Sequence, residues 1–279
     1  MRLTSLILAI FLLLACDEVP PVVTGAQPGS GPGSTSVDDQ QRQVLIEEFT
    51  GIRCVNCPAG AAAIEDLLAI HGERLVAVSI HAGFFAKPPH NGSTEDFITP
   101  EGDQLLSFLE EPLGYPTAVI NREELNGSLQ QGSGDWAGSI AEQLQQEPQV
   151  KIALTTDYNE TSGQLKIVST LFGQDNLTGG DNLALSVLLI ENGVVDPQTT
   201  PQGIQDDYVH KHVLREAVTG ALGDPLTETL APGTQIEVEH ELILDAAYKA
   251  DQTHVVAFVH RASGSKEVLQ AIEADVIDN

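Results

Sequence analysis

The chain has 279 residues and is strongly acidic, with 40 Asp and Glu residues against 13 Lys and Arg residues and a formal net charge of −27 at pH 7. Binding to nucleic acid or to anionic lipid head groups requires Lys and Arg, so this charge argues against both kinds of partner. With 42% hydrophobic residues the chain can form one or two ordinary cores, and its length favours two domains.

The N-terminus carries one positive charge, Arg2, and then an almost unbroken apolar run from Leu3 to Leu14. This run is too short to span a bilayer as a mature helix. It ends in Leu-Leu-Ala-Cys, which resembles the lipobox of bacterial lipoproteins. The resemblance implies a signal peptide over residues 1–15 and acylation of Cys16, with palmitate as an expected fatty acid. The alternative is a buried structural cysteine. Lipidation also explains the odd number of cysteines, because it leaves Cys54 and Cys57 as a pair.

A polar linker is expected next, followed by an α/β domain. Residues 16–42 consist largely of Pro, Gly, Ser, Thr and Asp, which predicts a flexible spacer after the acylated cysteine. Over residues 43–147 strand and helix patterns alternate, which predicts a β-α-β unit with parallel strands. The expected strands are Val44–Phe49, Leu75–Ile80 and Thr117–Asn121, and the expected helices are Pro58–His71, one starting at Thr99-Pro100 and one starting at Asp135.

Beyond Pro148 the apolar pattern changes to a period of two, which is typical of strands. The expected strands are Val150–Tyr158, Leu165–Leu171, Leu183–Glu191, Tyr208–Arg215, Gln235–Leu244, Thr253–His260 and Glu267–Val276. Strands of this number separated by turn residues favour an antiparallel β-sandwich. We therefore expect an all-β domain over residues 148–279.

The sequence Cys54-Val-Asn-Cys57-Pro58 lies at the turn between the first expected strand and helix. Backbone N–H groups at a helix N-terminus lack intrahelical partners and lower the pKa of a nearby thiol. Pro58 suits the first turn of a helix because it has no N–H to leave unpaired. The motif therefore predicts a redox-active pair. It also occurs as half of a zinc site, but the mature chain has no further cysteine, so we expect no metal and no cofactor.

A second element, Gly-Tyr115-Pro116-Thr117, leads directly into an expected strand. With a C-x-x-C after the first strand of a β-α-β unit, it resembles the thioredoxin fold, in which a cis-proline loop packs beside the cysteines. The resemblance implies that Pro116 is this cis proline. It also implies that Tyr115 and Thr117 flank a backbone edge on which an extended substrate peptide pairs. The alternative is an ordinary trans turn proline.

Glu48 lies six residues before Cys54, as does the buried acid of many thioredoxins that takes the proton of the second cysteine. The resemblance implies the same role for Glu48, and the alternative is a partly solvated carboxylate at a strand end. Two features depart from thioredoxins. Arg53 replaces their usual Trp, and Val-Asn replaces Gly-Pro between the cysteines, so the direction of electron flow does not carry over.

Taken together, these motifs resemble the lipoproteins related to the twenty-eight-kilodalton outer membrane protein. They are the lipobox, the polar spacer, Glu-Glu-Phe-Thr-Gly before Cys-x-x-Cys-Pro, Tyr-Pro-Thr, and a β-rich tail that includes Tyr208–Arg215. The resemblance covers nearly all of the mature chain. It implies a thioredoxin-like α/β domain followed by an all-β immunoglobulin-like sandwich, anchored at the outer membrane on its periplasmic or outer face.

Three functions fit these features. The leading hypothesis is a membrane-tethered thiol-disulfide oxidoreductase, in which Cys54 attacks a disulfide of a protein partner and Cys57 resolves the mixed disulfide. The second is a non-enzymatic surface binding protein with a structural disulfide. In it, His210 and His212 would face one side of a strand, which is compatible with metal binding but more typical of packing. The third is copper delivery through the two cysteines and His81 or His90.

Overall fold

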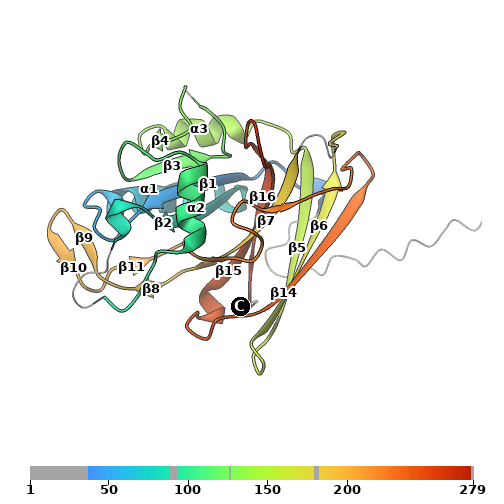
Figure 1. Ribbon diagram of the computed structural model, residues 1–279. Coiled ribbons are helices and arrows are strands. Elements are labelled where there is room, and N and C mark those ends of the chain that lie inside the picture. Colours follow the sequence, from blue (N-terminus) through green and yellow to red (C-terminus); the bar gives the residue numbers. More distant parts are fainter. Residues whose placement is uncertain (1–36, 88–92, 126, 179–181, 278–279) are drawn as a thin grey trace, which may run out of the picture.

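The computed structural model describes residues 37–87, 93–125, 127–178 and 182–277 (Figure 1). The predicted signal peptide, Cys16, most of the predicted linker and His90 lie outside these residues. The structure is rich in strands and is built around one mixed sheet of nine strands. Among the described residues, no helix is both long enough and apolar enough to cross a membrane.

The N-terminal half of the sheet carries the β-α-β unit. Strand β1 (Val44–Thr50) pairs in parallel with β2 (Leu75–His81) and antiparallel with β3 (Thr117–Ile120), and β4 (Gln131–Gly132) lies at the edge. Residues alternate between the two faces of β1, and both faces are buried. One face packs on helices α1 (Cys57–His71) and α3 (Trp136–Gln143), and the other packs on α2 (Pro100–Phe108). The expected helix start is confirmed at α2, where the Thr99 side chain accepts a hydrogen bond from Gly102 N at 3.0 Å.

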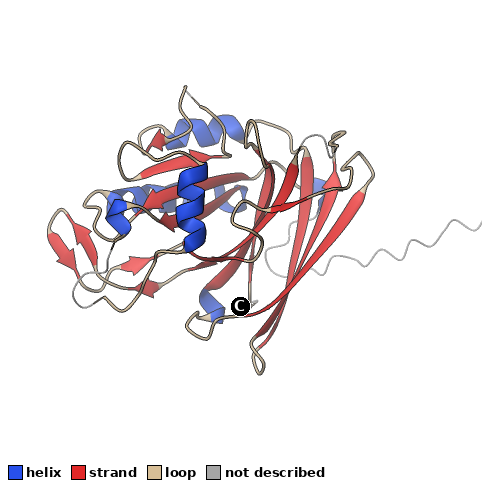
Figure 2. Ribbon diagram, viewed as in Figure 1, coloured by secondary structure: helices blue, strands red, loops and turns tan. Residues whose placement is uncertain are grey.

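The C-terminal half contributes a second layer. Strands β5 (Val150–Asn159), β6 (Gln164–Gly173) and β14 (Gln235–Ile243) form a separate antiparallel sheet, which Figure 2 shows beside the large one. It packs on β7 (Leu183–Glu191), β15 (Thr253–Arg261) and β16 (Val268–Asp275) of the large sheet through a shared apolar core. The expected period of two is visible in β6, whose residues alternate between buried and partly exposed.

The two halves share the large sheet. Its order is β16-β15-β7-β12-β2-β1-β3-β4, with the short β13 (Asp224–Pro225) also paired to β7. Strand β12 (Val213–Ala217) pairs antiparallel with β7 and in parallel with β2 through Val213 and Ser79. The sheet is mixed, because β1 and β12 pair in parallel with β2 whereas pairings such as β1 with β3 and β12 with β7 are antiparallel. Through β12, strands of the expected antiparallel C-terminal sandwich join the sheet of the N-terminal half. The boundary expected between residues 147 and 148 stays a prediction.

The expected strand Tyr208–Arg215 is wrong, because it is broken into β11 (Val209–His210) and β12. His212 between them has a φ of 54°, which is incompatible with a continuous strand. His210 and His212 therefore do not face one side of a strand. The remaining short strands are β8 (Val194–Val195), which pairs with β11, and β9 (Gln198–Thr200), which pairs with β10 (Gly203–Gln205). Short 3-10 helices occupy Val37–Asp39, Gly72–Arg74, Phe84–Ala86 and Ala250–Gln252.

Buried charges also join the halves. The Arg122 guanidinium forms an ion pair with the Glu47 carboxylate at 2.7 Å, and neither side chain is exposed. Arg122 also lies over the ring of Phe258 on β15, at 4.8 Å from its centroid. Arg42 donates to the carbonyl of Val268 at 2.6 Å. Groups from both halves thus satisfy each other inside one core, as buried charges require.

Candidate redox site

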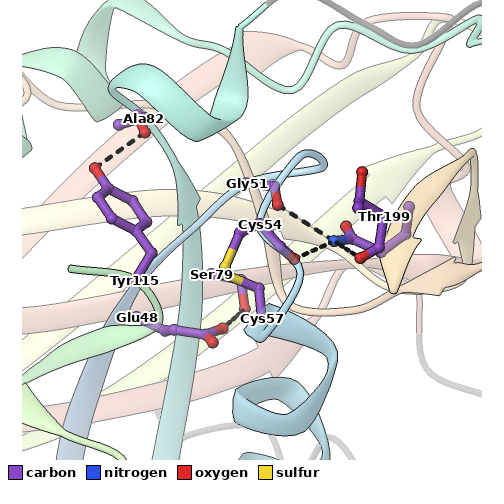
Figure 3. The surroundings of a disulfide bond; sticks show 9 residues. Glu48, Gly51, Cys54, Cys57, Ser79, Ala82, Tyr115 and Thr199 are labelled. Carbon is purple, nitrogen blue, oxygen red and sulfur yellow. Dashed lines mark hydrogen bonds between the residues drawn. A yellow bond between two sulfur atoms is a disulfide. The ribbon is translucent and has the colours of Figure 1, made fainter. Parts of the chain in front are cut away.

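The two cysteines of the C-x-x-C motif form a disulfide at the N-terminus of α1 (Figure 3). Cys57 is the first residue of the helix and Pro58 follows within its first turn. Cys54 lies in the preceding turn, where its N–H donates to the Gly51 carbonyl at 2.9 Å. Each cysteine is only 3% exposed. The pair therefore lies at the start of the helix, where the N–H groups of Cys57 and Ala59 donate to the carbonyls of Cys54 and Asn56, and it is shielded from solvent.

The Tyr115-Pro116 peptide bond is cis, and Pro116 lies against α1. A Cβ placed on Gly60 would lie 2.8 Å from the Pro116 side chain, so the helix and this loop are in close contact. The Tyr115 hydroxyl donates to the Ala82 carbonyl at 3.1 Å, and the Thr117 hydroxyl donates to the Gln131 carbonyl at 3.0 Å. Burial raises the pKa of Tyr115 to about 12. Both flanking side chains are thus held by internal hydrogen bonds.

Glu48 is buried on β1 and points toward the Cys57 side of the disulfide in Figure 3. Its Oε2 accepts a hydrogen bond from the Ser79 hydroxyl at 3.1 Å, and its Oε1 has no hydrogen-bond partner among the described residues. Burial raises the pKa of Glu48 to about 8, against the opposing effect of the Ser79 hydrogen bond. The carboxyl group can therefore gain or lose a proton near neutral pH.

A segment of the C-terminal half covers the cysteine turn. We call residues 194–212 the covering segment; it contains β8, β9, β10 and β11. The Gln198 amide donates to the carbonyls of Cys54 and Gly51 at 3.0 and 3.3 Å. The Thr199 N–H donates to the Ile52 carbonyl at 2.8 Å. In Figure 3 Thr199 lies beside Cys54 on the side away from Glu48. These bonds explain why the disulfide is buried.

A cavity of about 410 Å³ lies between α1, the sheet and the covering segment. Cys57 and Glu48 line it on one side, and Tyr208, His210 and His212 line it on the other. Most of its surface is apolar, and Cys54 is not among the lining residues. The cavity therefore gives the Cys57 side of the pair a neighbouring space that the Cys54 side lacks.

Histidines and aromatic rings form the wall next to the covering segment. The rings of His81 and Phe97 are stacked at 4.7 Å between centroids, and the His210 ring lies 4.6 Å from Phe97 and 4.8 Å from Tyr208. Burial lowers the pKa of His210 to about 4, and burial together with His210 lowers that of His81. Both imidazoles are therefore neutral at pH 7.

Charged residues at the cavity wall neutralise one another. Glu65 of α1 pairs with Lys211, and its Oε1 lies 2.9 Å from His212 Nε2. The hydrogen bond from His212 holds the pKa of Glu65 at about 2. His212, which the broken strand turns away from His210, thus binds α1. Among the described residues no group of three or more His, Cys, Asp or Glu side chains is placed to hold a metal ion.

Sequence reasoning named His210 and His212 of the covering segment only as possible neighbours on one strand face, and it did not place Gln198 or Tyr208 at the site. Both residues lie far along the chain from Cys54, and Gln198 is in a stretch with weak strand signals. Ser79, the partner of Glu48, is a small polar residue inside an apolar strand, and this is the one local signal that could have pointed to it. No spacing in the sequence indicates that residues 198 and 54 are in contact.

The family model of outer membrane protein Omp28 matches residues 111–279. The chain belongs to the Omp28 family. It is accordingly an outer membrane protein. No curated protein gives a significant match to the sequence.

Two solved structures share the fold of this chain, HBP35 and AGR_C_4864. HBP35 of Porphyromonas gingivalis superposes with a TM-score of 0.66 at 21% identity, covering 85% of this chain and 76% of that one. Protein AGR_C_4864 of Agrobacterium tumefaciens superposes with a TM-score of 0.55 at 13% identity, covering 86% and 97%. A domain of the outer membrane lipoprotein Omp28 of Porphyromonas gingivalis covers 46% of this chain and 88% of its own, at 17% identity and a TM-score of 0.32.

Proposed function

We propose that this Omp28-family protein is a lipid-anchored thiol-disulfide exchange protein of the outer membrane, with protein thiols and disulfides of the envelope or exterior as partners. In this proposal residues 1–15 are a signal peptide, Cys16 carries the lipid and residues 16–42 are a linker. Residues 43–147 then form a thioredoxin-like domain, and residues 148–279 form an immunoglobulin-like sandwich. Strands of the sandwich join the sheet of the thioredoxin-like domain.

The observation that carries the proposal is the Cys54–Cys57 pair at the N-terminus of α1, with Glu48 and Pro116 packed around it. The N–H groups of the first helical turn favour a thiolate in their neighbourhood. In the reduced protein the Cys54 thiolate would attack a partner disulfide, forming a mixed disulfide and releasing one partner thiolate. Cys57 would then attack the Cys54 sulfur, restoring the internal disulfide and releasing the second partner thiolate.

Glu48 fits the role of proton acceptor for Cys57. Its pKa of about 8 lies close to that of an ordinary thiol, so a proton can move between the two groups at little cost. Glu48 is also cut off from bulk water, because its side chain is buried. The side chain of Glu48 is longer than that of Asp, and Gly60 leaves room for it. A Cβ at residue 60 would lie only 2.7 Å from Glu48 Oε1.

The test is a reduction-potential titration of the Cys54–Cys57 pair combined with trapping by the Cys57→Ser variant. We expect a potential above about −300 mV, in the range of exchangeable disulfides, and covalent adducts of Cys57→Ser with envelope proteins. The Cys54→Ser variant is the matched control and should trap far less. A more negative potential with no adducts would mean that the disulfide is structural and would refute the proposal.

A further inference from the structure

We propose that the cavity beside Cys57 binds a small organic cation, an ammonium group carried on an apolar body such as a single ring. This binding site goes beyond disulfide exchange and does not depend on it. The site is formed where the covering segment lies over one face of α1, so each half of the chain contributes one wall.

The wall contributed by α1 consists mainly of small and apolar side chains. The residues of this helix face that line the cavity include Pro58, Ala61, Ala62 and Glu65. Their spacing of i, i+3, i+4 and i+7 places them on one face of the helix. Because two of them are alanines, this face leaves room beneath the covering segment. The resulting volume of about 410 Å³ lies in the range of small-molecule sites, so the wall can receive the apolar body of a ligand.

The wall contributed by the covering segment combines aromatic rings with a carboxylate. The rings of Tyr208 and His210 lie 4.8 Å apart between centroids, and both residues line the cavity. Burial lowers the pKa of His210 to about 4, so this imidazole is uncharged at pH 7. Asp207 also lines the cavity, and its accessible carboxylate forms no ion pair among the described residues. Aromatic rings beside a free carboxylate attract an organic cation through cation–π and ionic contacts.

The other ionisable groups of the cavity wall do not compete with Asp207 for a cationic ligand. Glu65 is already held by Lys211 and by the His212 imidazole. Burial raises the pKa of Glu48 to about 8, so this carboxyl is mostly uncharged at pH 7, and its Oε1 is not accessible to water. The net charge of −27 raises the local concentration of cations and lowers that of anions. A cation is therefore favoured over a neutral or anionic ligand of the same shape.

The test measures binding of three ring compounds of similar shape to the full chain by isothermal titration calorimetry at pH 7. The probes are 2-phenylethylamine, which is a cation, 2-phenylethanol, which is neutral, and 3-phenylpropionate, which is an anion. We expect 2-phenylethylamine to bind with a Kd on the order of 1 mM. The alcohol should bind about 2- to 5-fold more weakly, because an exposed ion pair contributes little, and the anion at least about tenfold more weakly.

Two pairs of variants separate this cavity from the general attraction of an acidic protein for cations. Asp207→Asn should weaken binding of 2-phenylethylamine about 2- to 5-fold and leave binding of 2-phenylethanol unchanged. Asp206→Asn removes the same charge from a neighbouring residue outside the lining and should leave both affinities unchanged. Ala61→Leu fills the cavity and should abolish binding of both compounds, whereas Ala69→Leu, at an exposed position of α1 outside the lining, should bind both normally.

A methyl NMR spectrum locates the bound ring. Ile64 lines the cavity, whereas Ile70 is 72% exposed on α1 outside it. Addition of 2-phenylethylamine should shift the δ1-methyl signal of Ile64 and leave that of Ile70 in place. This shift, together with the losses expected in Ala61→Leu and Asp207→Asn, would support the site. Absence of binding at about 5 mM, binding unaffected by Ala61→Leu, or equal losses in Asp206→Asn and Asp207→Asn would overturn it.

Discussion

We expect the covering segment to control access to the disulfide, and the Gln198→Ala variant tests this directly. Gln198 donates two hydrogen bonds from its side-chain amide to the cysteine turn, at 3.0 Å to Cys54 O and 3.3 Å to Gly51 O. A net hydrogen bond contributes about 0.5–1.5 kcal/mol, and the two N–H groups of this amide are also shared with the Thr199 carbonyl, so we expect their loss to destabilise the closed position by about 1–2 kcal/mol. The equilibrium between closed and open positions then shifts roughly 5- to 30-fold toward the open one.

The assay is the second-order rate of reduction of the Cys54–Cys57 disulfide by a phosphine, followed by alkylation and mass spectrometry. Because both cysteines are only 3% exposed, reduction requires opening, and the rate should rise roughly 5- to 30-fold in Gln198→Ala. Gln202→Ala, on the exposed turn of the same hairpin, is the matched control and should react at the parental rate. A rate within twofold of the parent in a folded Gln198→Ala protein would show that these bonds do not limit access.

Three further predictions concern buried groups of the N-terminal half. Because burial raises the pKa of Glu48 from 4.5 to about 8, the folded protein retains a proton that the unfolded chain releases, so stability should fall as pH rises between these values. The free energy of unfolding should fall by at most about 1.4 kcal/mol per pH unit. Urea midpoints measured at several pH values should depend less on pH in Glu48→Gln than in the parent protein. The same pH dependence in both proteins would contradict the raised pKa of Glu48. Gly60→Ala should destabilise the protein by about 1–3 kcal/mol, because its Cβ would lie 2.7 Å from Glu48 Oε1. Gly138→Ala, in open space on α3, should instead stabilise it by about 0.5–1 kcal/mol. If thermal unfolding ranks the two variants the other way, α1 does not pack closely on Glu48. Arg122→Met should cost about 3–5 kcal/mol in urea unfolding because it leaves the Glu47 carboxylate buried and unpaired, and a loss below about 1 kcal/mol would mean that water reaches this carboxylate.

Local sequence patterns predicted the elements around the cysteines well. The expected strand Val44–Phe49 and helix Pro58–His71 match β1 and α1 to within one residue at each end. The reason is that alternation, an apolar helical face and Pro58 near a helix start are all encoded by near neighbours in the chain. The same holds for β7, whose bounds are those expected from its apolar run.

Long-range features were not predicted. The pairing of Val213 with Ser79 joins the strands of the two halves into one sheet, and nothing near either residue specifies it. The break between β11 and β12 depends on the backbone of His212, which is fixed by bonds to Asn192 and Glu65 from distant elements. The contact of Gln198 with the cysteine turn likewise joins residues that are 144 positions apart in the chain. Sequence motifs therefore located the two sulfurs, Glu48 and Pro116, but not the covering segment that packs over them.

The surroundings of the disulfide are built by both halves of the chain through the shared sheet. The covering segment leaves the sheet at the end of β7 and returns to it at Val213, where the Ser79 N–H donates to the His212 carbonyl at 2.7 Å. Because Ser79 also donates to Glu48, the residue that anchors the end of the covering segment is the one that orients the buried acid. Any displacement of the covering segment at this end therefore disturbs Glu48 as well. We therefore expect access to the disulfide and the pKa of Glu48 to be coupled through Ser79 of β2.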